Sequence, residues 1–327
     1  MDPGLVTTDV DVALRALLGG GLVAMPTETV YGLGGDAEDP EAVARIYAAK
    51  GRPADHPLIV HLADAALVDD GWAVEVPGLA RLVAAACWPG PLTLVLRRGP
   101  RAGDHVTGGQ DTVGLRVPSH PVALELLRRF GGGVAAPSAN RFGRVSPTDA
   151  DHVVAELADV LVVGRDVVLD GGPSHVGVES TIVDCTGTAP RLLRPGAVGT
   201  EEIEAVTGLE VTAADPTVRA PGTLAAHYAP TARVVLVDAA EVAATVPGAA
   251  SPVGLLAPAA VPTPDGVRRL AAPEDSAAYA RALYAVLRSA DDEGIATIVA
   301  VAPTGDVLAA AVRDRLRRAA VGSAHTR

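Results

Sequence analysis

Apolar and polar positions follow two different spacings along the first two thirds of the chain. Asp39 and Pro40 are residue types of a helix N-cap and first turn, and Val43, Ile46 and Tyr47 follow at helical spacing. Other largely apolar runs are only four or five residues long, which is typical of buried strands. We predict strands at 22–25, 58–62, 92–96, 113–117, 133–136, 160–163 and 181–184 and helices at 9–18, 40–49, 79–86, 121–129, 148–157 and 200–206.

The order of these elements predicts an α/β fold in two domains. Helices fall between only some of the strands, which favours a twisted sheet of mixed strand direction over a regular βαβ repeat. Residues 212–231 are rich in Ala, Pro, Thr and Gly and lack periodicity, as in an interdomain linker. We therefore expect a sheet domain over 1–211 and a smaller Rossmann-like domain over 232–327. Its expected elements are strands at 233–238 and 295–301 and helices at 275–289 and 306–320, with 242–264 interpreted as loop-rich.

Composition narrows the classes of function. No run of about 18 apolar residues could span a bilayer, and residues 1–8 lack the order of a targeting segment. We therefore expect a cytoplasmic protein without membrane association. The net charge of -12 disfavours stable nucleic-acid binding, which depends on Lys and Arg at phosphates. The two cysteines, Cys87 and Cys185, lie far apart in apolar surroundings, which predicts buried thiols rather than a disulfide or a zinc site.

The scarcity of lysine draws attention to one segment. Lys50 is the only lysine among 27 basic residues, and it begins the sequence Lys-Gly-Arg-Pro at positions 50–53. Two cations held by a glycine and a proline suit a phosphate group. A Walker loop is excluded, because that motif requires Gly-Lys followed by Ser or Thr. The alternative interpretation is a charged helix end that complements the helix dipole.

Further polar residues follow predicted strands. Residues 26–34 (Pro-Thr-Glu-Thr-Val-Tyr-Gly-Leu-Gly) and 137–140 (Pro-Ser-Ala-Asn) could surround a small polar ligand, although hydroxyl groups that cap local turns are the alternative. The first segment lacks the third glycine of a dinucleotide-binding fingerprint. Arg116 lies within an apolar strand and needs an anionic partner, because an unpaired buried charge is costly.

Six motifs in this order resemble those of the YrdC-type threonylcarbamoyl-AMP synthases. They are Pro-Thr-Glu-Thr-Val-Tyr-Gly-Leu-Gly, Lys-Gly-Arg-Pro, Pro-Ser-Ala-Asn, Ser-Pro-Thr, Glu-Ser-Thr and Arg-Pro-Gly. The resemblance covers residues 7–208, and the sequence His-Tyr-Ala-Pro at 227–230 with the second domain is similar to the family's longer form. It implies a YrdC-like catalytic domain that joins L-threonine, bicarbonate (as CO₂) and ATP, with Mg²⁺, into threonylcarbamoyladenylate, pyrophosphate and water. A downstream tRNA threonylcarbamoyl transferase complex would use this adenylate in tRNA modification.

The resemblance also implies roles for individual residues. The family's catalytic tetrad corresponds to Lys50, Arg52, Ser138 and Asn140. The residues implied for ATP are Arg52, His56, Thr112, Ser138, Ser146, Arg194, His227 and Tyr228. Those implied for threonine are Thr29, His61, Arg116 and Ser180, and no protein ligand is assigned to a metal. Two positions depart from the family: Leu224 stands where a lysine is common, and His56 where an asparagine is common.

The implied mechanism needs no covalent enzyme nucleophile. The threonine amine attacks CO₂, the resulting carbamate attacks the α-phosphorus of ATP, and Lys50, Arg52 and Arg194 neutralise charge on the phosphates. Two alternatives stay open. An RNA-binding module is disfavoured by the acidic charge and the 3% aromatic content. A carbamoyl-adenylating enzyme would consume carbamoyl phosphate, but such proteins usually carry zinc-finger cysteines, which this sequence lacks.

Overall fold

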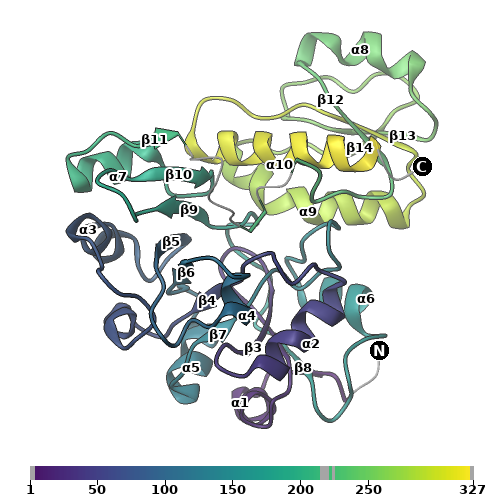
Figure 1. Cartoon of the computed structure of the whole chain (residues 1–327). Coiled ribbons are helices and arrows are strands. Elements are labelled where there is room, and N and C mark those ends of the chain that lie inside the picture. The colour runs from purple at the N-terminus through teal and green to yellow at the C-terminus, as the bar shows by residue number, and fades with distance from the viewer. Residues whose placement is uncertain (1–3, 214–220, 223–224, 325–327) are drawn as a thin grey trace. The chain divides into compact units, whose positions relative to one another are not determined.

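The computed structural model describes residues 4–213, 221–222 and 225–324, which fall into two compact units (Figure 1). The second unit contains residues 225–324 together with two short segments from earlier in the chain, 143–146 and 176–178. The other described residues form the first unit. The predicted linker falls partly outside the described residues, as does Leu224.

The first unit is built on a mixed sheet, as predicted. Its strand order is β1-β8-β2-β3-β7-β4-β6-β5-β9-β10-β11, and the parallel pairs include β4 with β6 and β5 with β9, whereas β5 and β6 are antiparallel. The strands are β1 (Val6–Thr7), β2 (Val23–Met25), β3 (Gly32–Asp36), β4 (Ile59–His61), β5 (Leu92–Arg97), β6 (Thr112–Arg116), β7 (Val134–Ala135), β8 (Val167–Leu169), β9 (Thr181–Asp184), β10 (Arg191–Arg194) and β11 (Thr212–Ala213).

The helices of this unit begin where the sequence offers caps. The carboxylates of Asp9, Asp39 and Asp149 accept hydrogen bonds from backbone N–H groups in the first turns of α1, α2 and α6. Gly51 ends α2 in the left-handed conformation. The helical elements are α1 (Val10–Leu18), α2 (Pro40–Lys50), η1 (Ala65–Asp69), α3 (Gly78–Cys87), α4 (Asp104–Thr107), α5 (Pro121–Phe130), α6 (Ala150–Leu157) and α7 (Thr200–Thr207).

Two assignments from the sequence, the strand at 160–163 and the glycine-rich turn at 26–34, need correction. The strand predicted at 160–163 is wrong: Val162 and Val163 are about half exposed, and the chain turns at Gly164 before β8. The polar segment 26–34 is only partly a loop, because its glycines form β3 beside β2. A Cβ atom at Gly34 would lie 2.8 Å from a methyl group of Val134, so this strand must be rich in glycine.

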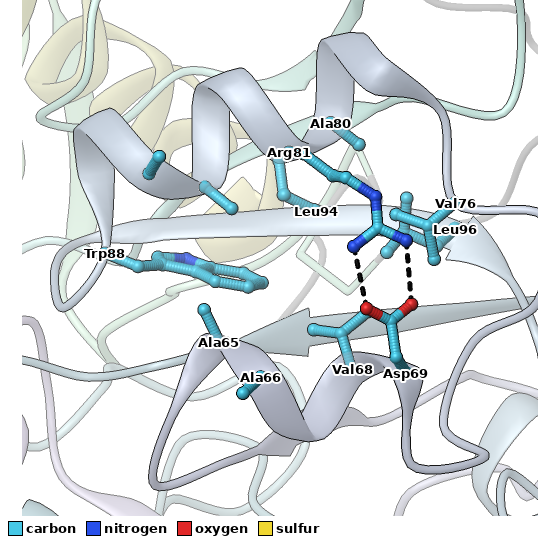
Figure 2. A pocket seen from close by; sticks show the side chains of 12 residues that line it. Ala65, Ala66, Val68, Asp69, Val76, Ala80, Arg81, Trp88, Leu94 and Leu96 are labelled. Carbon is cyan, nitrogen blue, oxygen red and sulfur yellow. Dashed lines mark hydrogen bonds and ion pairs between the residues drawn. The ribbon is translucent and has the colours of Figure 1, made fainter.

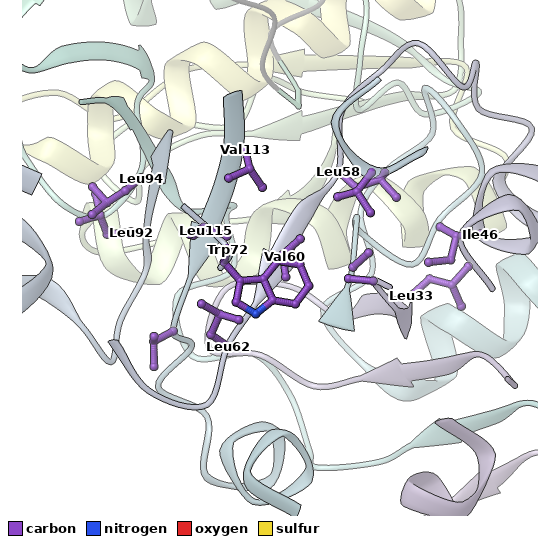
Figure 3. Close-up of a cluster of buried hydrophobic side chains, with 14 of the residues drawn as sticks. Leu33, Ile46, Leu58, Val60, Leu62, Trp72, Leu92, Leu94, Val113 and Leu115 are labelled. Atoms are coloured by element: carbon purple, nitrogen blue, oxygen red, sulfur yellow. The ribbon is translucent and has the colours of Figure 1, made fainter. Parts of the chain in front are cut away.

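The main core of the first unit covers one face of the sheet, so the residues that alternate with core residues lie on the opposite face. Fully buried Trp72 lies among leucines and valines from several strands (Figure 3). Alternate residues of a strand lie on opposite faces of a sheet. Val60, Leu94 and Leu115 belong to this core, so their strand neighbours, such as His61 and Arg116, lie on the other face.

The second unit is a small parallel sheet, and the expected Rossmann-like fold is confirmed. Its strand order is β12-β15-β13-β14, with all three pairs parallel. The interpretation of 242–264 as loop-rich is wrong in part, because this segment contains the buried strand β13. The elements are β12 (Arg233–Leu236), η2 (Ala239–Glu241), α8 (Val242–Thr245), η3 (Val246–Gly248), β13 (Val253–Leu256), β14 (Arg268–Ala271), α9 (Ser276–Asp292), β15 (Thr297–Ala300) and α10 (Val307–Ala324).

Across the described residues, every helix is too short or too polar to traverse a lipid bilayer.

Candidate active site

Several candidate residues share the sheet face opposite the main core. Thr112 and Arg116 alternate with core residues on β6, and His61 is the register partner of Arg116 on β4. A small pocket lies over the same strands. Its lining residues are Pro57, Leu58, Ile59, Thr93, Val95, Gln110, Thr112, Gly114, Ile182 and Pro221. The structure thus groups residues that are up to about 160 positions apart in the sequence.

Lys50, at the C-terminal end of α2, is almost completely buried. Its Nζ donates hydrogen bonds to the carbonyl oxygens of Ser138 and Asn140, and its own carbonyl accepts from the N–H of Phe142 at 2.7 Å. Burial, and next to it the charge of Arg52, lower the pKa of Lys50 well below its usual value. Two carbonyl acceptors favour the ammonium form, as would the arrival of an anionic ligand. Lys50 therefore links the C-terminal end of α2 to the 138–142 turn.

Arg52 connects this turn with the sheet pocket. Its Nη2 donates to the carbonyl oxygen of Pro57 at 2.9 Å, and its guanidinium lies 5.8 Å from the ring centroid of Phe142. The imidazole of His56 contacts the same phenyl ring edge-on, with centroids 5.4 Å apart. Lys50, Arg52 and His56 thus converge on the 138–142 turn from one side, while Thr112 lines the pocket beyond Pro57.

Arg194 and Ser180 also belong to this face. The Nε and Nη2 atoms of Arg194 donate to the Ser180 carbonyl at 3.1 and 3.0 Å, and Nη2 reaches the Ser180 hydroxyl at 3.1 Å. The Ser180 hydroxyl is 2.8 Å from that of Thr93, which lines the pocket. The third nitrogen of Arg194, Nη1, donates to the carbonyl of Pro221 at 2.9 Å. A residue implied for ATP and one implied for threonine therefore contact each other directly.

Arg116 has the anionic partner that its position required. Its Nη2 donates to Glu28 Oε1 at 2.7 Å, and both side chains are about 5% exposed. Glu28 Oε2 accepts from the N–H of Ser119 at 3.1 Å, while Arg116 Nε donates weakly to Gly90 at 3.4 Å. Within the described part of the chain, Nη1 of Arg116 makes no hydrogen bond. The sequence indicated that a partner was needed but could not identify Glu28.

His61 adds a neutral polar group beside this ion pair. Burial, followed by the charge of Arg116, lowers the pKa of His61 to about 3, so its ring is uncharged at neutral pH. Its Nδ1 is buried and lacks a hydrogen-bond partner among the residues that the structure describes. A buried ring nitrogen of this kind is normally bonded, so His61 is well suited to meet a ligand.

Thr29 is fully buried in the 26–34 segment. Thr27 donates its hydroxyl proton to the Val30 carbonyl at 2.6 Å, so Thr29, 2.8 Å away, must donate to Thr27. The alternative considered from the sequence, a hydroxyl group that caps a local turn, therefore applies to Thr27, whose Oγ1 accepts from the N–H of Val30. Thr29 keeps the lone pairs of its oxygen, which could accept a hydrogen bond from an amine or a hydroxyl group.

Three candidate residues lie in the second unit. Ser146 belongs to its 143–146 segment and is fully buried. Tyr228 is also buried and has a positive φ of 59°. Its ring lies 4.2 Å from that of His227, 5.7 Å from that of Tyr284 and 5.4 Å from the guanidinium of Arg315 on α10. The second domain therefore holds the His227–Tyr228 turn in a conformation that most residues avoid.

Metal binding by the protein alone has no support in the described residues. Among them, no three His, Cys, Asp or Glu side chains are placed to hold an ion. Cys87 and Cys185 are both buried free thiols, as predicted, and burial raises their pKa values to about 11 and about 12.

A second pocket, formed by η1, α3 and β5, lacks these chemical features (Figure 2). Its walls are mostly apolar, and the indole N–H of Trp88 is already bonded to the Leu92 carbonyl at 2.8 Å. Arg81 and Asp69 form a two-bond ion pair at 2.7 and 2.8 Å, and both are about half exposed. None of the candidate residues lines this pocket.

Comparisons with known proteins point to one family. The Sua5, YciO and YrdC family model, described as "Telomere recombination", matches residues 15–196. A model described as "Threonylcarbamoyl-AMP synthase, C-terminal domain" matches residues 198–321.

Individual relatives agree with this assignment. The threonylcarbamoyl-AMP synthase of Bacillus subtilis is 48% identical over 62% of this chain, and the putative enzyme of Mycobacterium tuberculosis is 43% identical over 64%. The alignments cover 58% and 93% of those proteins, so the chain spans little more than half of the first. The structure of Pyrococcus abyssi Sua5 complexed with L-threonine is 38% identical, with a TM-score of 0.85 over 96% of this chain and 94% of that one.

Proposed function

Because the chain belongs to the Sua5, YciO and YrdC family, we propose that it is a threonylcarbamoyl-AMP synthase. This nucleotidyltransferase would join L-threonine, CO₂ from bicarbonate and ATP into threonylcarbamoyladenylate, releasing pyrophosphate. The observation that carries the proposal is that the first unit holds two kinds of binding group. The 138–142 turn with Lys50 and Arg52 is cationic, whereas the Arg116–Glu28 pair beside His61 is net neutral.

These two regions fit the two substrates. Arg52 and Arg194 would neutralise charge on the ATP phosphates, and Lys50 would hold the Ser138 and Asn140 turn against them. Nη1 of Arg116, which makes no hydrogen bond with the described residues, would take the threonine carboxylate, and Thr29, His61 and Ser180 would complete this part of the site. The proposal extends to His56, Thr112, Ser146, His227 and Tyr228 as residues that help to bind ATP.

In the proposed reaction, the enzyme mainly positions reactants. The threonine amine forms a bond to the carbon of CO₂ and releases a proton, which gives a carbamate. A carbamate oxygen then bonds to the α-phosphorus, and the bond to the pyrophosphate oxygen breaks. Mg²⁺ would arrive on the phosphates of ATP, because phosphate oxygens and water are its usual ligands. The proposed setting is the cytoplasm, where a tRNA threonylcarbamoyl transferase complex would consume the adenylate.

The test is to follow pyrophosphate release from ATP, Mg²⁺ and bicarbonate with and without L-threonine, and to identify the nucleotide product by mass spectrometry. Release that depends on threonine, together with threonylcarbamoyladenylate, would support the proposal. Equal release with carbamoyl phosphate and no threonine would favour a carbamoyl-adenylating enzyme. Salt-sensitive RNA binding without turnover would favour an RNA-binding module. Arg52→Met should retain the fold and lose turnover.

A further inference from the structure

We infer that Glu28 makes the threonine end of the site selective for an amino acid with no net charge. Glu28 would act through Arg116 as a positioning residue, and nothing in the comparisons assigns it a role. The inference rests on the proposed function, because it takes Arg116 to bind the carboxylate of the substrate.

Among the described residues, the geometry leaves one nitrogen of Arg116, Nη1 with its two N–H groups, without a hydrogen bond. Glu28 occupies Nη2 at 2.7 Å, Gly90 occupies Nε at 3.4 Å, and Nη1 is without a hydrogen bond in the described chain. Glu28 is itself fixed by the N–H of Ser119 at 3.1 Å. The guanidinium is therefore held at two nitrogens, and its two N–H groups on Nη1 are directed away from Glu28 and Gly90, which sets the direction from which a carboxylate approaches.

The group formed by Arg116, Glu28 and His61 carries no net charge. Arg116 and Glu28 form a buried ion pair, and His61 next to Arg116 is neutral at pH 7. A buried charge without compensation is costly, so an anion added to this neutral group is disfavoured. A zwitterion avoids the cost, because its ammonium group is attached to the carbon next to its carboxylate. Thr29 Oγ1, whose proton goes to Thr27, is an acceptor that suits this ammonium group.

The inference concerns the charge of the ligand, so it is tested with three ligands of similar shape. They are L-threonine, which is a zwitterion, (2S,3R)-2,3-dihydroxybutanoate, which is an anion, and L-threoninamide, which is a cation. Calorimetry at pH 7 measures their affinities for the wild-type protein. We expect threonine to bind at least about tenfold more tightly than either analogue. Binding of threonine itself checks the proposed function separately.

Glu28→Gln keeps the size of the side chain and removes its charge. We expect it to bind the anionic analogue more tightly relative to threonine, by on the order of tenfold. Asp166→Asn is the matched control. Asp166 is a buried carboxylate that forms an ion pair with Arg45, with a distance of 2.6 Å between Oδ2 and Nη2, and it contacts neither Glu28 nor Arg116. This variant should lower the melting temperature and leave the preference unchanged.

Two outcomes would overturn the inference. One is a wild-type protein that binds the anion as tightly as threonine, a result that does not depend on whether any variant folds. The other is a folded Glu28→Gln protein whose preference among the three ligands equals that of wild type. Failure of wild type to bind threonine at all would instead contradict the proposed function.

Discussion

Replacing Lys50 by methionine tests whether its ammonium group fixes the 138–142 turn. Methionine keeps a long side chain but cannot donate to the carbonyl oxygens of Ser138 and Asn140. Two hydrogen bonds from an amino group are worth about 1–3 kcal/mol together, and more when the group is charged. The cost of burying the ammonium, seen in its lowered pKa, offsets part of this gain. We therefore expect a net loss of about 1–3 kcal/mol at pH 7.

The effect should grow with pH, which separates it from a simple packing defect. The pKa of Lys50 is lower in the folded protein than in the unfolded chain, so the unfolded chain binds more protons between these two values. Wild-type stability therefore rises with pH in this window, up to the unfolded value of about 10.4, whereas methionine contributes no such rise. The difference between wild type and variant should increase from pH 7 towards pH 10.

Denaturant unfolding at several pH values measures this difference. Arg15→Met is the control, because Arg15 is exposed on α1 and should leave stability within about 0.5 kcal/mol. Equal stabilities of wild type and Lys50→Met at every pH would refute the role of Lys50 in holding the turn. A constant difference would refute the assigned direction of its pKa shift.

Two more predictions concern other buried groups. Arg315→Met should lower the melting temperature and weaken ATP binding, because Arg315 packs on the Tyr228 ring. The loss of ATP affinity in the Arg315→Met/Tyr228→Ala double variant should be smaller than the sum of the two single losses, which calorimetry measures. Arg317→Met, at an exposed position, is the control and should change neither quantity. Cys87 and Cys185 should react with a thiol reagent at pH 7 only after unfolding, because burial raises both thiol pKa values; fast labelling of the native protein would contradict this.

The sequence predicted local features of the fold better than its long-range contacts. The cap at Asp39 and the end of α2 near Lys50 follow from neighbouring residues, and both are as expected. β3 was missed because its glycines look like a turn until β2 and Val134 are seen beside it. β13 was missed because alanines and prolines surround a short apolar run. Strand pairing depends on tertiary context that local patterns do not contain.

The candidate site shows the same limit. The sequence singled out Lys50 by its scarcity and Arg116 by its apolar strand, and both are buried polar residues of the site. The sequence did not identify the partner of Arg116, because Glu28 is 88 positions away. It did not identify the partner of Lys50 either, because Lys50 bonds to backbone carbonyl groups. Every residue has a backbone carbonyl oxygen, so a contact with one cannot be predicted from the types of side chain in the sequence.

In the Rossmann-like sheet of the second domain, acidic side chains cap two of the described helices where such folds often bind a phosphate. Ligands bind these sheets at the carboxyl ends of the strands, where N–H groups at helix ends attract anions. Here Asp275 accepts from the N–H of Ala278 at 2.6 Å at the start of α9. Asp306 accepts from that of Ala309 at 2.8 Å at the start of α10. These carboxylates would repel a phosphate at the starts of α9 and α10.

Isotope labelling tests the central claim most directly. The protein is incubated with ATP, Mg²⁺, L-threonine and carbon-13 bicarbonate, and the nucleotide product is analysed by mass spectrometry with fragmentation. The account predicts an adenylate that carries one carbon-13 atom in the carbonyl group between the threonine nitrogen and the phosphate. An unlabelled adenylate, or a labelled product that contains no threonine, would contradict it.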